Sequence, residues 1–119
     1  MKIVIAGGSG FLGRALMASL AADGHEVFVL SRGKPGPAET AGVCFVDWSP
    51  NGAVGGWARA IHGADAVINL AGAGIADKRW SAARKQLLRE SRVLSTRSLA
   101  EAIRTGAITP SVFIQGSAI

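Results

Sequence analysis

Short apolar runs recur along the chain and alternate with segments of helical periodicity. The runs are rich in Val, Ile and Phe, as strands buried on both faces of a sheet are. They predict strands over residues 2–6, 26–30, 42–46, 65–70 and 111–116. The segments between them predict helices over Phe11–Ala22, Val54–Ile61 and Ser81–Arg104. This alternation predicts an α/β fold, because such strands pair in parallel through helical crossovers.

Right-handed crossovers would arrange these strands as one doubly wound parallel sheet of the Rossmann type, with strand order 3-2-1-4-5. In such a sheet a ligand binds at the carboxyl ends of the first and fourth strands, where the strand order reverses. Residues 33–37 contain two glycines and two prolines and are expected to form a surface loop. We therefore predict a single domain over residues 1–119.

The loop after the first predicted strand carries glycines at the spacing of a dinucleotide-binding turn. Gly7 would permit the tight turn, Gly10 would let the backbone approach the pyrophosphate, and Gly13 would let the helix pack closely. Free amides at the start of the helix would face the anion. The alternative is a glycine-rich turn with a purely structural role. The residues expected to bind the cofactor here are Gly7, Gly8, Ser9, Gly10, Phe11, Leu12 and Gly13.

Ser31 and Arg32 end the second predicted strand, where an acidic residue would select the ribose hydroxyls of NAD. A hydroxyl and a guanidinium both suit the 2′-phosphate of NADP instead. One charge-assisted hydrogen bond of about 1.5–3 kcal/mol gives a preference of roughly ten- to a hundredfold. We therefore expect NADP to bind more tightly than NAD, the alternative being an arginine that is merely solvated.

Two further strand ends carry candidate cofactor contacts. After the third strand, Asp47 is positioned to bond the adenine amino group and Trp48 to cover the edge of the ring, although an ordinary turn is an open alternative. The fourth strand leads into mostly small residues that would let the cofactor approach the backbone. These residues are Asn69, Leu70, Ala71 and Gly72.

Charge and composition narrow the function further. The net charge of +5 favours anionic ligands such as a dinucleotide, but the basic residues form no dense block, so nucleic acid is not an expected partner. The single cysteine, Cys44, lies in an apolar run and is expected in the core, and no metal site is predicted. No run has the length of a membrane span, and a cytoplasmic location is expected.

Together these motifs resemble the extended short-chain dehydrogenase/reductases, and within them the sugar-nucleotide epimerase-like branch, the NAD-dependent epimerase/dehydratase family. The resemblance covers the whole chain and includes residues 6–13, 31–32, 69–72, 79–80, 84–85, 91–93, 96–97 and 116–118. It implies an NADP(H)-dependent oxidoreductase or epimerase in which Ser117 is a catalytic residue facing the nicotinamide. It also implies a small-molecule substrate, with a nucleotide sugar as one candidate.

The family's catalytic Tyr-x-x-x-Lys pair has no counterpart here, because the chain contains no tyrosine. A second departure is Arg92, at a position where many short-chain enzymes have asparagine. The resemblance therefore implies an N-terminal portion, truncated after the fifth strand, without the catalytic Tyr/Lys segment and the substrate domain. This portion alone is expected to be inactive. The alternative function is a non-catalytic module that binds a nucleotide or a partner, as the cell-division-inhibitor labels of some relatives suggest.

The fifth predicted strand would form an edge of the sheet. Its apolar residues Val112, Phe113 and Ile114 would lie bare in a chain that stops there. We therefore expect a homo-oligomer, or aggregation, through this strand.

Overall fold

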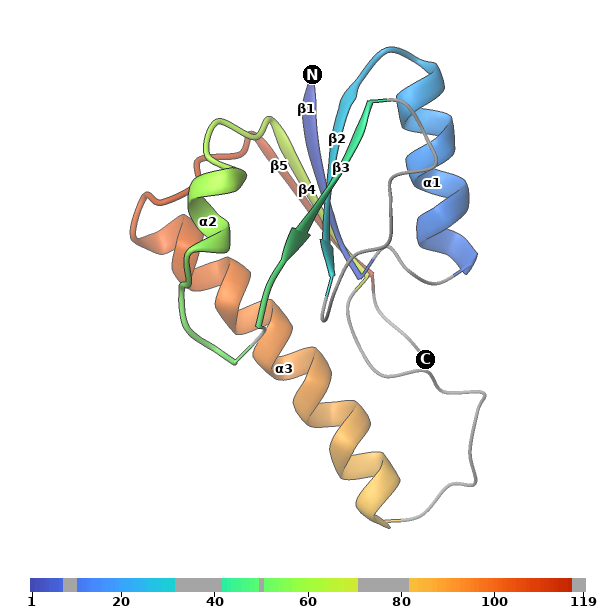
Figure 1. Ribbon diagram of the computed structural model, residues 1–119. Helices are drawn as coiled ribbons and strands as arrows, with labels where there is room; N and C mark the ends of the chain where they lie inside the picture. Colours follow the sequence, from blue (N-terminus) through green and yellow to red (C-terminus); the bar gives the residue numbers. More distant parts are fainter. Residues whose placement is uncertain (8–10, 32–41, 50, 71–81, 117–119) are drawn as a thin grey trace.

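The computed structural model describes residues 1–7, 11–31, 42–49, 51–70 and 82–116. Its strands form one parallel sheet in the order β3-β2-β1-β4-β5, which confirms the predicted topology (Figure 1). The strands are β1 (Lys2–Ala6), β2 (Glu26–Ser31), β3 (Val43–Asp47), β4 (Ala66–Asn69) and β5 (Val112–Gln115). The helices are α1 (Phe11–Ala22), α2 (Trp57–Ala60) and α3 (Ala82–Arg104).

The helices cover opposite faces of the sheet, with α1 on one face and α2 and α3 on the other (Figure 1). Successive side chains of a strand point to opposite faces, so Val4 faces α2 and α3 while Ile5 faces α1, and both are fully buried. The core on the α1 side is formed by Ile5, Met17, Val27, Val29 and Val43. The larger core on the other side includes Val4, Leu30, Trp57, Ile61, Val67, Leu99 and Ile108.

Helix α2 is shorter than predicted, because residues 54–56 and Ile61 lie outside it. Two successive glycines, Gly55 and Gly56, come directly before its first residue, and glycine is a poor helix former. The single turn is held instead by tertiary packing: Trp57 is buried and meets Trp48 edge to face, with 5.4 Å between the ring centroids.

Cys44 is exposed, so the expectation that it lies in the core is wrong. The residue pairs with Phe28 of β2 and therefore points to the α2 side of the sheet. Strand β3 is at the edge of the sheet, and the one-turn helix α2 does not extend over this position. An apolar run in the sequence therefore does not guarantee burial at a sheet edge.

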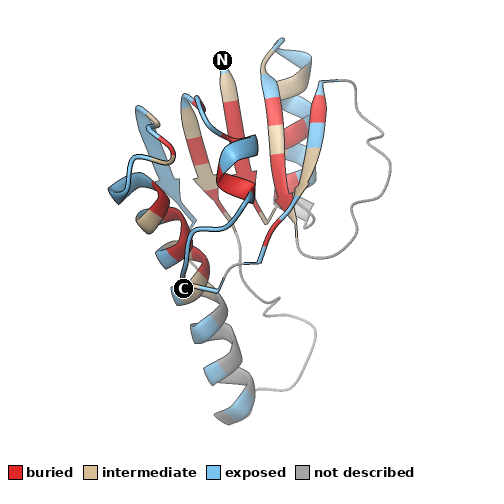
Figure 2. Cartoon of the chain, turned by 60° about the vertical axis from the view of Figure 1, so that its left-hand side comes forward, coloured by how far each residue is buried: buried red, intermediate tan, exposed pale blue. Residues whose placement is uncertain are grey.

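Strand β5 is exposed along its whole length, as predicted (Figure 2). Val112 is 46% exposed, Phe113 36% and Ile114 51%. Within the described part of the chain, β5 pairs only with β4, and its other edge has no strand partner.

Candidate functional site

The carboxyl ends of four strands come together at one edge of the sheet. Ala6 of β1 pairs with Leu30 of β2 and with Asn69 of β4. Backbone hydrogen bonds continue past these pairs: the Gly7 amide donates to the Leu30 carbonyl at 3.1 Å, and the Leu70 amide donates to the Ala6 carbonyl at 2.8 Å. The Gly116 amide likewise donates to the Asn69 carbonyl at 2.8 Å. Along this carboxyl edge the residues therefore follow in the order Ser31, Gly7, Leu70 and Gly116.

Gly7, the first residue after β1, has the conformation expected of a glycine that begins a tight turn. Gly7 has φ 78°, in the left-handed region that side-chain-bearing residues rarely adopt. The chain enters α1 at Phe11 and Leu12, and Gly13 is buried within the first turn of the helix. Strand β1, Gly7 and helix α1 thus follow in the order that is expected of a dinucleotide site. Gly8, Ser9 and Gly10 lie outside the described residues.

The end of β2 lies beside Gly7, and the end of β3 lies beside that of β2. Ser31 is half-buried and pairs with Asp47, which is exposed. Arg32 lies outside the described residues. Trp48 is only 4% exposed and its amide donates to the Ser31 carbonyl at 3.1 Å. Trp48 is therefore part of the core, and the ring contact predicted for its indole stays a prediction.

On the other side of β1, strand β4 ends in a buried polar residue. Asn69 is 0% exposed, and its side-chain amide donates to Gln115 Oε1 at 3.0 Å and to Thr96 Oγ1 at 3.3 Å. Leu70 is half-buried. The predicted residues Ala71, Gly72 and Ser117 lie outside the described residues.

The sequence patterns predict no contact for Thr96 or Gln115. Thr96 lies on α3, 27 positions from Asn69 along the chain, and Gln115 ends β5, 46 positions from Asn69. The Thr96 hydroxyl also donates to Gln115 Oε1 at 3.3 Å. No local pattern could reveal this contact, because three separate elements bring the side chains together.

The clearest electrostatic perturbation lies away from the carboxyl edge. A hydrogen bond from the Arg104 guanidinium lowers the pKa of Glu101, and the carboxylate in turn raises the pKa of Arg104. The two side chains approach to 2.7 Å on the last turns of α3. Because α3 leads into the amino end of β5, this pair lies toward the opposite edge of the sheet.

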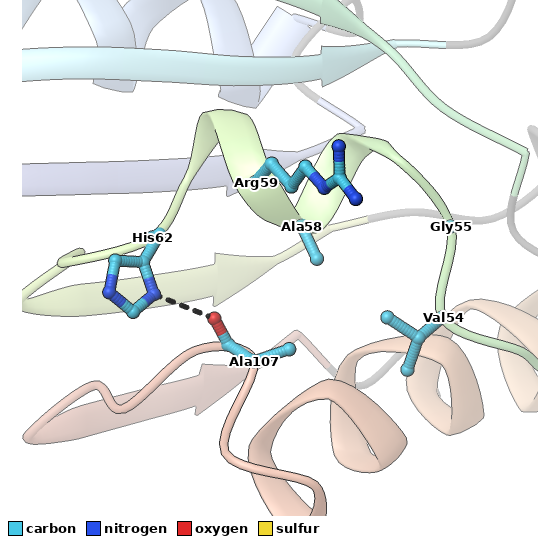
Figure 3. Close-up of a pocket in the computed structure, with 6 residues that line it drawn as sticks. All are labelled: Val54, Gly55, Ala58, Arg59, His62 and Ala107. Carbon is cyan, nitrogen blue, oxygen red and sulfur yellow. Dashed lines mark hydrogen bonds between the residues drawn. The ribbon is translucent and has the colours of Figure 1, made fainter.

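A hollow of about 450 Å³ also lies toward the amino ends of the strands, between α2 and the segment after α3. Figure 3 shows the side chains of Val54, Ala58 and Ala107 facing it, while His62 Nδ1 lies 3.0 Å from the Ala107 carbonyl oxygen. These mostly apolar walls are typical of a gap in helix packing and contrast with the polar carboxyl edge.

In the described part of the chain, no three His, Cys, Asp or Glu side chains gather as metal ligands would. Nor does any helix among those residues have the length and apolar character to cross a membrane.

A parallel sheet with a glycine turn between its central strand and the first helix defines a Rossmann-type nucleotide-binding domain. The chain belongs to the NAD dependent epimerase/dehydratase family, whose model matches residues 3–119.

Named relatives agree with this assignment. The chain is 37% identical to epimerase family protein Mb2239 of Mycobacterium bovis over 117 residues, which are 98% of this chain and 36% of that protein. It is 34% identical to the human epimerase family protein SDR39U1 over 116 residues, which are 96% of this chain and 36% of that protein. The chain thus spans little more than a third of the length of these curated relatives.

Solved structures show the same fold. The crystal structure of human SDR39U1 (isoform 2) with NADPH matches all of this chain and 37% of that one, with a TM-score of 0.78 and 33% identity. UDP-glucuronic acid 4-epimerase from Bacillus cereus, solved with a substrate analogue and NAD, matches 97% of this chain and 39% of that one. Its TM-score is 0.74 at 21% identity, which is a likeness of fold alone.

Proposed function

We propose that this chain is the NADP(H)-binding portion of an epimerase-like oxidoreductase of the extended short-chain dehydrogenase/reductase group. The observation that carries the proposal is the turn after β1, where Gly7 at φ 78° leads from the central strand into α1 at the edge where the strand order reverses. Main-chain amides at such a turn suit a diphosphate, because no side chain obstructs them. The NADPH in the human neighbour supports this cofactor class.

In this proposal the two halves of the dinucleotide lie on opposite sides of β1. The pyrophosphate lies against the glycine turn, residues 7–13. The adenosine half extends over β2 and β3, where Ser31 and Arg32 bind the 2′-phosphate and Asp47 is available to the base. The nicotinamide half then lies over β4 and β5, beside the segment that begins at Asn69. There it faces Ser117, the proposed catalytic residue.

Cofactor preference tests the assignment of Arg32. We expect NADPH to bind roughly ten- to a hundredfold more tightly than NADH, because a 2′-phosphate gains a charge-assisted hydrogen bond. Arg32→Ala removes most of this preference, while Arg59→Ala, at an exposed position on α2, leaves it intact. Dissociation constants from fluorescence titration measure both effects. Equal affinities of the unaltered chain for the two cofactors would refute NADP selectivity.

The longer protein's substrate and reaction belong to the same proposal. A nucleotide sugar is the candidate substrate, bound outside these 119 residues, and the location is cytoplasmic. The chain alone should show no turnover because it contains no tyrosine to act as the family's proton donor. Hydride transfer by this polypeptide, followed by NADPH absorbance, would contradict that expectation.

A further inference from the structure

Asn69, Thr96 and Gln115, here called the amide network, join three elements at the carboxyl edge. Asn69 ends β4, Thr96 lies on α3, and Gln115 ends β5. Asn69 is fully buried, Thr96 is half-buried and Gln115 is exposed. The network therefore extends from the interior to the surface on which the nicotinamide half is proposed to lie.

The donors and acceptors of the amide network match. A side-chain amide has two N–H groups, and those of Asn69 donate to Thr96 Oγ1 and to Gln115 Oε1. The Thr96 hydroxyl uses its single proton toward the same Gln115 oxygen. The Gln115 nitrogen then donates to the Gly116 carbonyl at 3.3 Å. Both the oxygen and the nitrogen of the Gln115 side-chain amide thus have defined partners, and these contacts specify the orientation of the side chain.

The backbone beside the amide network is equally restrained. The Gly116 amide donates to the Asn69 carbonyl. A Cβ at Gly116 would lie 2.9 Å from Leu70 Cδ2 and 3.0 Å from the Asn69 carbonyl oxygen, closer than side-chain carbons normally approach. The ends of β4 and β5 are therefore in close contact through both main chain and side chains.

We infer that the amide network is a positioning device, which holds the carboxyl ends of β4 and β5 against α3 so that the nicotinamide half of the cofactor meets a preformed surface. The Asn69 side chain is buried and hydrogen-bonded to both partners, so its effect on this surface passes through Thr96 and Gln115. This inference rests on the proposed dinucleotide function. It makes Thr96 and Gln115 positioning residues for one half of the cofactor only.

The test compares NADPH with 2′,5′-ADP, which has the adenosine 2′-phosphate but no nicotinamide. Thr96→Val keeps the shape of the side chain and removes the hydroxyl. We expect it to raise the Kd for NADPH roughly three- to tenfold, the effect of one lost hydrogen bond, and to leave the Kd for 2′,5′-ADP unchanged. Gln115→Met, on the exposed strand, should do the same, whereas Thr96→Ser should restore tight NADPH binding.

Thr105→Val is the matched control, because the Thr105 hydroxyl bonds the Glu101 carbonyl at the far end of α3. It should change neither Kd. Circular dichroism verifies that each variant is folded, and Gln115→Met provides the test if Thr96→Val is not. The positioning role would be overturned if Thr96→Val raised the Kd for NADPH and for 2′,5′-ADP equally, or changed neither. It would also be overturned if the unaltered chain bound the two ligands with equal affinity. Failure of the unaltered chain to bind 2′,5′-ADP would instead refute the proposed function.

Discussion

Strands β1 and β5 are similar in sequence and opposite in environment. Each contains three successive apolar residues, residues 3–5 and 112–114. Those of β1 are at most 6% exposed, whereas those of β5 are 36–51% exposed (Figure 2). β1 has a strand on both sides and helices over both faces, while β5 pairs only with β4 in the described part of the chain. Neighbouring elements, and not the apolar pattern itself, therefore determine burial in this sheet.

This difference separates two physical roles. A buried apolar side chain stabilises the fold by leaving water and by close packing. An exposed apolar edge strand adds little to the stability of a single chain, but its unpaired backbone groups and apolar surface favour association. The largest predicted effect comes from a pair of substitutions that compares these two roles directly.

The pair Ile5→Ala and Ile114→Ala makes the same chemical change in the two strands. Ile5 is fully buried and Ile114 is 51% exposed. We expect Ile5→Ala to lower the free energy of unfolding by about 2–5 kcal/mol, because it removes buried methyl groups and leaves a cavity. Ile114→Ala should change it by about 0.5 kcal/mol or less. Urea denaturation measures both values, and comparable losses would contradict the distinction between the strands.

Self-association should depend on β5 and not on other exposed surfaces. We propose that two copies meet through this strand, so that sedimentation velocity shows a concentration-dependent shift to larger species. Phe113→Lys places a charge in that edge and should return the chain to a monomer. Val54→Lys, at another exposed apolar residue, is the control and should not affect the oligomeric state. A stable monomer at every concentration would refute association through β5.

The smallest effect is expected at the exposed pair of Glu101 and Arg104. The hydrogen bonds that Arg104 donates to the Glu101 carboxylate lower the folded-state pKa of Glu101 below its ordinary value of 4.5. The ionised carboxylate therefore stabilises the fold above that pH, and this contribution is lost as the pH falls through the lowered pKa. Glu101→Gln should cause a small decrease in Tm at neutral pH that disappears in acid. A Tm difference that stays constant across the acid range would contradict the lowered pKa.

Much of the fold could be predicted from local sequence patterns. The bounds of α1 match because a glycine turn precedes it and Gly24, at φ 87°, follows it closely. The strand order follows from crossover handedness once the alternation is recognised. The length of α2 and the exposure of Cys44 were mispredicted, because both depend on how far one element extends over another.

Some features of the candidate site could likewise be predicted from local sequence, and others could not. The left-handed backbone of Gly7 and the burial of Gly13 agree with what their spacing predicts, since a tight turn and close helix packing require residues without side chains. Their contact with a cofactor stays a prediction. The burial of Trp48 against Trp57 and the contacts of Asn69 could not be predicted in this way, because they join residues distant in sequence. Such contacts exist only once the sheet and helices are assembled.

The most direct measurement of the central claim is a nuclear magnetic resonance titration of the folded chain with NADPH, followed at backbone amides on both edges of the sheet. We expect saturable shifts at the carboxyl edge, at Gly7, Ser31, Leu70 and Gly116, with Gly63 and Gly106 near the amino edge unaffected. Saturable shifts confined to the amino edge, or no saturable change in well-folded protein, would contradict the claim.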